Sequence, residues 1–234
     1  MAPTPDGEPT PAQRRKMALI SERKPKGSIE DSGYFRVTGD KDMAALMQKV
    51  QSAVIANGYE LESLIYEEVP ESFYEKRQNV NETGIKNIQK DTFMHKVKIK
   101  NNLNKGIDLD FAIFTNNKIY IVETKDGSNF DTKKASGEVD SLQKAKKIVH
   151  TADHGQRGVE CMIVLWNEED VSKASFKDKR AQKMLISGRD FCTKFKINFA
   201  SIQNRRKEDT ETNRQYVQEQ MKKITKENNN ETII

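Results

Sequence analysis

The sequence predicts an α/β fold in which helices flank a mixed central β-sheet, with polar extensions at both ends of the chain. Three strand patterns, at 93–100, 109–114 and 118–125, lie between two helical patterns that begin near residues 42 and 132. A continuous apolar run at 159–166 adds a strand of the fully buried type. The order helix, three strands, helix, strand is that of a layered sheet with helices on its faces.

Polar residues are unevenly distributed along the 234 residues of the chain. Five of the six prolines stand in the first 25 residues, where apolar residues are sparse, and the chain is almost wholly polar again from Gln203 onward. We therefore expect a flexible, basic and Pro-rich arm over 1–41, one folded domain over 42–202, and a polar helix or tail over 203–234.

Apolar residues at helical spacing predict the first helix, which Asp42 is placed to cap and Gly58 is expected to end. A second apolar group predicts a following helix before Pro70. The apolar residues of the two groups are Met43, Leu46, Met47, Val50, Val54 and Ile55, and then Leu61, Leu64, Ile65 and Val69.

The strand patterns differ in their expected exposure. Over 93–100 apolar residues and His95 alternate with Met94 and three lysines, which is typical of a strand with one exposed face. We interpret His95 as a core or edge residue of the sheet. The next two strands are joined by Thr115-Asn116-Asn117, a sequence that suits a hairpin turn.

The remaining elements follow from apolar spacing in the second half of the chain. A helix is predicted within 132–150, because Val139, Leu142, Ala145 and Val149 share one face. A polar helix is predicted around 178–187. A final strand is predicted over 191–199, where Phe191, Phe195, Ile197 and Phe199 alternate with polar residues and Cys192.

Composition narrows the class of protein. Forty basic residues against thirty-five acidic ones, a net charge of +5, mildly favour a polyanionic partner. The two cysteines, Cys161 and Cys192, provide neither a disulfide framework nor a CxxC zinc pair. No apolar run approaches the roughly 18 residues of a membrane span. These features predict a soluble, cytoplasmic protein.

Acidic residues and a lysine gather on the predicted hairpin. Because side chains alternate along a strand, Glu123 and Lys125 share one face at the end of an apolar strand. The hairpin turn brings Asp110 close to opposite Val122 or Glu123. Two carboxylates at this separation make an oxygen site that suits Mg²⁺, with the carbonyl of Thr124 as a further ligand and the Lys125 ammonium placed to position water. A solvated hairpin face with cross-strand ion pairs is the alternative interpretation.

Asp110, followed thirteen positions on by Glu123-Thr124-Lys125, resembles the motif of the PD-(D/E)xK nuclease superfamily over roughly residues 42–166. Leu109 stands where that motif often has proline. The resemblance implies a restriction-endonuclease-like core in which Asp110 and Glu123 bind Mg²⁺, or Mn²⁺ in its place, and Lys125 assists the attacking water. Asp108 is the second choice for the first ligand. An acid preceding the sheet often joins such sites, and the candidates here are Glu62, Glu67, Glu68 and Glu82.

The resemblance and the chain length favour a type II restriction enzyme, a site-specific deoxyribonuclease that cuts double-stranded DNA as a homodimer. About seventy residues beyond the strand at 159–166 are available to read bases. Two alternatives are another nuclease of the superfamily (a resolvase, repair nuclease, toxin or viral RNA endonuclease) and a non-catalytic nucleic-acid-binding module.

Overall fold

The computed structural model describes residues 18–73, 75–81, 88, 90–100, 106–127, 132–174 and 178–231. The chain forms two compact units. The sheet unit comprises Ile65–Phe199, and the helical unit comprises Met1–Leu64 together with Ala200–Ile234. The division predicted from composition, at residues 41 and 202, stays a prediction. Within the described residues, no helix is both long and apolar enough to cross a membrane.

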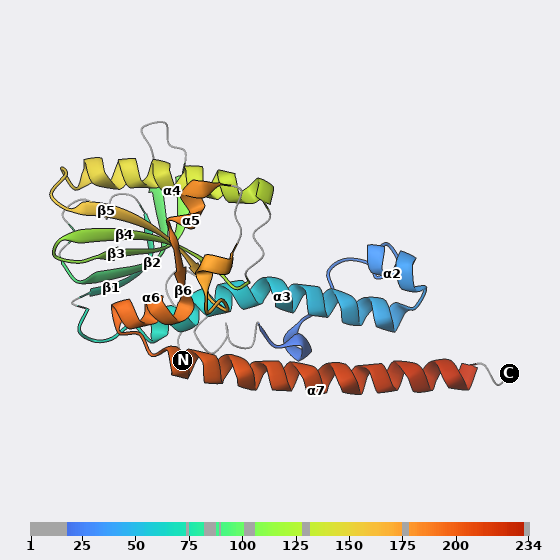
Figure 1. The fold of residues 1–234 in the computed structure, drawn as a ribbon. Coiled ribbons are helices and arrows are strands. Elements are labelled where there is room, and N and C mark those ends of the chain that lie inside the picture. The colour runs from blue at the N-terminus through green and yellow to red at the C-terminus, as the bar shows by residue number, and fades with distance from the viewer. Residues whose placement is uncertain are drawn as a thin grey trace. The chain divides into compact units, whose positions relative to one another are not determined.

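The sheet unit contains a six-stranded mixed sheet whose strands lie side by side in chain order. Neighbours pair antiparallel in the middle, β2 with β3 and β3 with β4, and parallel elsewhere. Helix α4 (Thr132–Ala152) and helix α6 (Gly188–Phe195) lie on opposite faces of this sheet (Figure 1). This arrangement confirms the predicted fold class. The strands are β1 (Glu75–Asn81), β2 (Thr92–Lys100), β3 (Gly106–Phe114), β4 (Lys118–Lys125), β5 (Gly158–Leu165) and β6 (Leu185–Ser187).

The predicted hairpin joins β3 to β4 through Thr115, Asn116 and Asn117. The Thr115 N–H donates to the Lys118 carbonyl over 2.9 Å, and the Thr115 hydroxyl donates to the same oxygen over 2.8 Å. Beyond this turn Phe114 pairs with Ile119 and Phe111 pairs with Val122. Turn and pairing together set which residues of the two strands face each other.

Helix α4 packs on one face of the sheet through the predicted stripe Val139, Leu142, Ala145 and Val149, each at most 2% exposed. The stripe meets Ile121 of β4 and other buried strand residues. Because parallel strands such as β4 and β5 need a crossover connection, α4 returns the chain across this face. Burial of one such leucine contributes roughly 1.5–3 kcal/mol.

Aromatic side chains fill the opposite face. Phe93, Phe111 and Phe191 contact one another in series, with ring centroids 5.3 and 6.5 Å apart. His95 is fully buried and stacks on Phe111 at 5.2 Å, so its interpretation as a core residue is confirmed. Met94 is also fully buried, and the prediction of an exposed face at this part of β2 is therefore wrong.

The strand predicted over 191–199 is wrong, because Gly188–Phe195 forms helix α6. Phe191 and Phe195 are four residues apart, a spacing that places two side chains on one face of either a strand or a helix. The Ser187 hydroxyl accepts from the Asp190 N–H, which starts a helix, and Lys196 ends it in the left-handed conformation. The polar helix predicted around 178–187 is reduced to α5 (Lys179–Gln182), followed by strand β6.

The helical unit is built on two long helices, α3 (Lys41–Glu67) and α7 (Phe199–Glu231), with η1 (Ile20–Glu22) and α2 (Gly33–Thr38). The two helices predicted before Pro70 are one, because α3 continues through Gly58. Asp40 rather than Asp42 caps it, accepting from the Met43 N–H at 2.9 Å. Ile224 of α7 packs with Leu46 of α3 in a small buried cluster.

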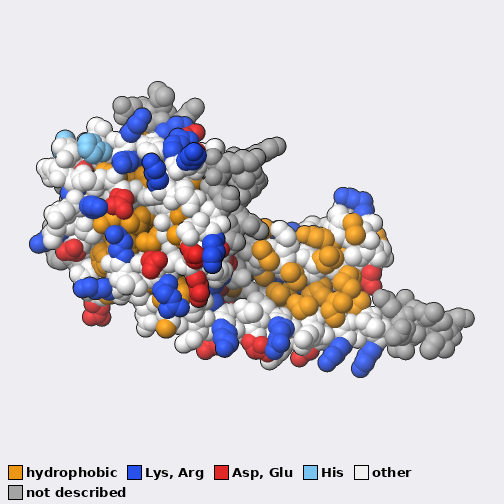
Figure 2. Space-filling model, in the orientation of Figure 1, with side chains coloured by type: hydrophobic (Ala, Val, Ile, Leu, Met, Phe, Trp, Pro, Cys, Tyr) orange, Lys and Arg blue, Asp and Glu red, His pale blue; other side chains and the backbone are white. Residues whose placement is uncertain are grey.

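Apolar side chains are also exposed on the helical unit, where Figure 2 shows a group of hydrophobic residues at the surface. Val54, Ile55 and Tyr59 of α3 are each more than half exposed. Exposed apolar groups of this kind are typical of surfaces that contact other molecules.

The packing of α4 generates a stability prediction. Leu142→Ala should lower the free energy of unfolding by about 2–5 kcal/mol, because it leaves a cavity between α4 and the sheet. Urea unfolding followed by circular dichroism measures this change. Lys144→Ala, on the exposed side of the same helix, is the control and should change stability by no more than about 0.5 kcal/mol. Equal effects of the two substitutions would contradict the packing described.

Candidate active site

Asp110 and Glu123 come together at the end of the β3–β4 hairpin remote from its turn. The paired residues of β3 and β4 end with Phe111 and Val122, and Asp110 and Glu123 are the next residue on each strand. The Thr124 N–H donates to Asp110 Oδ2 over 2.6 Å, which ties the carboxylate of one strand to the backbone of the other. The structure therefore places the predicted acid on β3 against the predicted Glu-x-Lys segment on β4.

Lys125 lies beside these acids. Its ammonium Nζ is 2.8 Å from Glu123 Oε1 and 2.9 Å from Glu138 Oε1 of helix α4. Burial, the largest single influence, lowers the pKa of Lys125, but the charges and hydrogen bonds of Glu123 and Glu138 together raise the pKa above its ordinary value. The lysine is therefore a cation at neutral pH and can hydrogen-bond anionic oxygens.

Glu138 is the residue of this cluster that the sequence did not indicate. It precedes the buried stripe residue Val139 and lies one helical turn before Leu142. A charged residue at the border of an apolar helix face was the available signal. That signal is weak, because most such residues simply face solvent.

The pairing of β2 with β3 is irregular beside Asp110. The ladder passes from the His95–Phe111 pair to the Val97–Leu109 pair and skips the position between them. Lys96, which occupies that position on β2, has a positive φ of 52°. A lysine in this conformation is strained, and strained residues cluster at functional sites.

Asp108, the second choice for the first ligand, has different surroundings. Its side chain is 81% exposed and forms an ion pair at 3.4 Å with Lys98, its cross-strand neighbour. This is the solvated ion pair that the alternative interpretation expected of the whole hairpin face, and such pairs contribute little to stability.

The structure describes three of the four candidate upstream acids. Glu62 belongs to the helical unit, Glu67 and Glu68 are partly buried in the sheet unit, and Glu82 lies outside the described residues. Across the described part of the chain, no three or more His, Cys, Asp or Glu side chains gather as a group that could hold a metal ion. The participation of any of these four glutamates stays a prediction.

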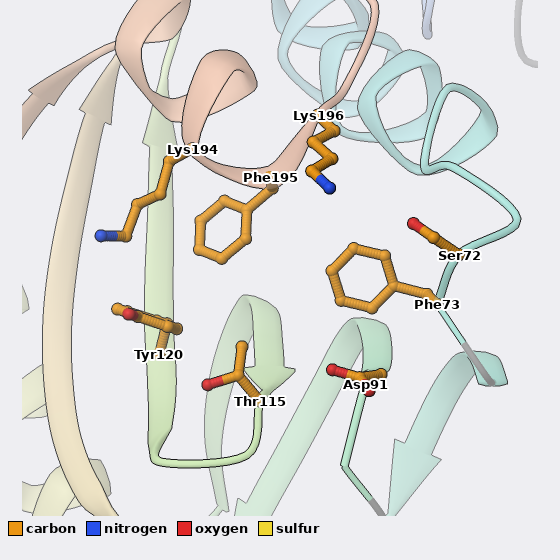
Figure 3. Close-up of a pocket in the computed structure, with 8 residues that line it drawn as sticks. All are labelled: Ser72, Phe73, Asp91, Thr115, Tyr120, Lys194, Phe195 and Lys196. Atoms are coloured by element: carbon orange, nitrogen blue, oxygen red, sulfur yellow. The ribbon is translucent and has the colours of Figure 1, made fainter.

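A hollow of about 480 Å³ lies elsewhere, at the turn end of the hairpin, and Figure 3 shows its lining. Phe73 and Phe195 face each other across it, and Lys194 lies 4.9 Å from the centre of the Tyr120 ring. Asp110, in the middle of β3, and Glu123, near the far end of β4, do not line this hollow, which is therefore distinct from the candidate active site.

A mixed sheet flanked by helices, with an acid facing a Glu-Thr-Lys segment at one strand end, is consistent with a restriction-endonuclease-like core. No protein-family model matches the chain. The chain is 33% identical over 211 residues to the type II restriction enzyme HhaII of Haemophilus parahaemolyticus, an alignment that covers 83% of this chain and 89% of that enzyme. The chain therefore belongs to the family of type II restriction enzymes that includes HhaII.

A more distant likeness is to the crystal structure of protein VC1899 from Vibrio cholerae, with 18% identity and a TM-score of 0.36. The match covers 80% of this chain and 50% of that one, so this chain spans about half the length of that protein. This likeness is too distant to inform the site.

The ion pairs of Lys125 generate a second prediction. Without metal, Lys125→Met should lower the free energy of unfolding by about 1–2 kcal/mol, because it leaves the carboxylates of Glu123 and Glu138 near each other without their shared cation. The control is Lys118→Met, which breaks the exposed pair with Glu160 and should cost at most about 1 kcal/mol. Urea unfolding in EDTA measures both.

The pH dependence follows from the raised pKa of Lys125. A group whose pKa is raised by folding stabilises the folded state. This stabilisation is complete at pH values below the pKa of the group in the unfolded chain, and it is lost as the pH rises through the pKa in the folded protein. The difference in the free energy of unfolding between wild type and Lys125→Met should therefore stay constant from about pH 6 to about pH 9. A difference that vanished within this range would contradict the charged pair.

Proposed function

We propose that the chain is a Mg²⁺-dependent endonuclease of the PD-(D/E)xK superfamily that hydrolyses phosphodiester bonds of double-stranded DNA at a specific sequence. The observation that carries the proposal is the placement of Asp110 against Glu123-Thr124-Lys125 at one end of the hairpin, in a chain of the type II restriction enzyme family. The cross-strand placement matters because a Glu-x-Lys segment alone is common in proteins.

The donor set fits a magnesium ion. Asp110 and Glu123 supply carboxylate oxygens, which Mg²⁺ prefers over nitrogen and sulfur. In an antiparallel ladder the N–H and C=O of one residue point to the same neighbouring strand. Because the Thr124 N–H meets Asp110, the Thr124 carbonyl is directed to the same side and is the proposed third protein ligand. Mn²⁺ has the same preference for oxygen and is expected to substitute.

When bound, Mg²⁺ polarises the phosphoryl oxygen and lowers the pKa of the attacking water. The protein's own contribution is to orient the reactants. The Asp110 carboxylate is held by the Thr124 N–H, which restricts its rotation. The Lys125 ammonium, charged at neutral pH, donates hydrogen bonds to the attacking water and to the anionic phosphoryl oxygens, on which charge develops in the transition state.

We propose double-stranded DNA as the substrate, the cytoplasm as the place of action, and residues 42–202 as the nuclease domain. A two-fold homodimer would match a palindromic site, and the exposed apolar side chains of α3 support that part of the proposal.

Cleavage of plasmid DNA by the purified protein, with Mg²⁺ and with EDTA, tests the function. Discrete fragments with Mg²⁺ alone are expected. A smear, or cleavage of RNA only, would instead support another nuclease of the superfamily, and no cleavage with Mg²⁺ or Mn²⁺ would contradict the enzyme proposal.

The proposed ligands generate a prediction about cleavage. Asp110→Asn and Glu123→Gln should each lower the single-turnover cleavage rate by about 1,000-fold, because each removes a carboxylate charge from the metal site. Binding to a DNA fragment without divalent metal, measured by fluorescence anisotropy, should be retained. Asp108→Asn is the matched control on the same strand and should cleave within about threefold of wild type. Near-normal cleavage by either ligand variant would refute its assignment.

A further inference from the structure

The Lys125 ammonium lies between two carboxylates that come from different elements. Nζ is 2.8 Å from Glu123 Oε1 on the same strand and 2.9 Å from Glu138 Oε1 on helix α4. The three side chains are between 20 and 30% exposed, so solvent screens their charges only in part. Glu123 is also a proposed metal ligand, whereas the proposed chemistry gives Glu138 no task.

Helix packing holds Glu138 in place. Its neighbour Val139 is fully buried and Leu142, one turn further on, is 2% exposed. The carboxylate is therefore fixed by the docking of α4 on the sheet. Its second oxygen, Oε2, is buried and accepts no hydrogen bond from the described residues. A buried carboxylate oxygen in this situation lowers stability, and such groups in native proteins are associated with functional roles.

Metal binding changes the electrostatic balance around Lys125. A divalent cation at Glu123 offsets the charge of that carboxylate and repels the ammonium next to it. Glu138 is then an anion that continues to attract Lys125. If neither acid held the ammonium, the long and flexible lysine side chain would turn toward solvent.

We propose that Glu138 is a positioning residue, which holds the Lys125 ammonium beside the reacting phosphate while Glu123 is bound to Mg²⁺. The inference rests on the proposed function, and it assigns Glu138 a role through Lys125 rather than contact with metal or substrate.

Chemical labelling tests the contact without reference to cleavage. The full-length protein is treated with a limiting amine-acetylating reagent, with Mg²⁺ and with EDTA, and acetylation of each lysine is followed by mass spectrometry. In Glu138→Gln with Mg²⁺, acetylation of Lys125 should rise about fivefold, the factor that corresponds to loss of about 1 kcal/mol of interaction. Lys118 serves as an internal reference. Asp140→Asn, which removes an exposed carboxylate from the same helix, should leave Lys125 unchanged.

Single-turnover cleavage tests the role. Glu138→Gln should lower the maximal rate by about 100-fold, the scale of a misplaced catalytic group. The Mg²⁺ concentration for half-maximal rate should stay within about threefold of wild type, because the proposed role of Glu138 is to hold Lys125 and not the metal. Loss of a residue that holds a metal or orients its ligands typically shifts that concentration by about tenfold or more. In a Lys125→Met background the same substitution should have no further effect, since Glu138 acts through Lys125. Asp140→Asn should cleave as wild type.

The outcomes separate this inference from the proposed function. An inactive wild-type protein would refute the proposed function, whereas the labelling would still report on the Glu138–Lys125 contact. In an active protein, unchanged labelling or an unchanged rate in Glu138→Gln would overturn the role of Glu138. Two further results would overturn this role, because each would show that Glu138 acts independently of Lys125. One is an additional loss of rate when Glu138→Gln is added to Lys125→Met, and the other is a tenfold shift in the Mg²⁺ concentration for half-maximal rate.

Discussion

The antiparallel pairing of β3 with β4 fixes, through a single register, both the core of the sheet unit and the arrangement of its acids. The register that sets Ile121 opposite Ala112 in the buried cluster ends at the Phe111–Val122 pair, and Asp110 and Glu123 are the next residue on each strand. A slip of one residue would turn every side chain of one strand to the other face. Burial of the apolar pairs therefore enforces the geometry of the polar ones, and the candidate site uses a register that the core has already determined.

The packing of helix α4 on the sheet adds a third acid, Glu138, to this arrangement. As the crossover between the parallel strands β4 and β5, the helix must return across the sheet, and its apolar stripe selects the face that carries the core. Glu138 stands at the border of that stripe and reaches Lys125 at the end of β4. The electrostatic environment of the lysine therefore depends on hydrophobic packing, because a helix that docked differently would carry Glu138 away from it.

Ion pairs of two kinds occur around this sheet, and their exposure to solvent distinguishes them. Lys98–Asp108 and Lys118–Glu160 are exposed to solvent at the strand ends and contribute little. Lys125 is instead enclosed by two acids and is less than a third exposed. Burial lowers the pKa of the lysine, but the charges and hydrogen bonds of the two acids outweigh it and raise that pKa above its ordinary value. An isolated surface pair could be replaced without consequence, whereas Lys125, Glu123 and Glu138 are energetically linked, and a change in one alters the other two.

The sequence alone determined what depends on neighbours along the chain. Alternation along β3 and β4 and a suitable turn were enough to predict the hairpin and to bring Asp110 toward Glu123 and Lys125, because a hairpin is a local structure. Tertiary structure decided the rest. The four-residue spacing of Phe191 and Phe195 fits a strand and a helix equally, so packing on the aromatic face selected α6. The left-handed conformation of Lys96 occurs where the pairing of β2 with β3 skips a position, which the local sequence does not indicate. Glu138 is thirteen residues beyond Lys125, and their contact exists because α4 docks on the sheet at one angle, which long-range packing sets and local sequence does not encode.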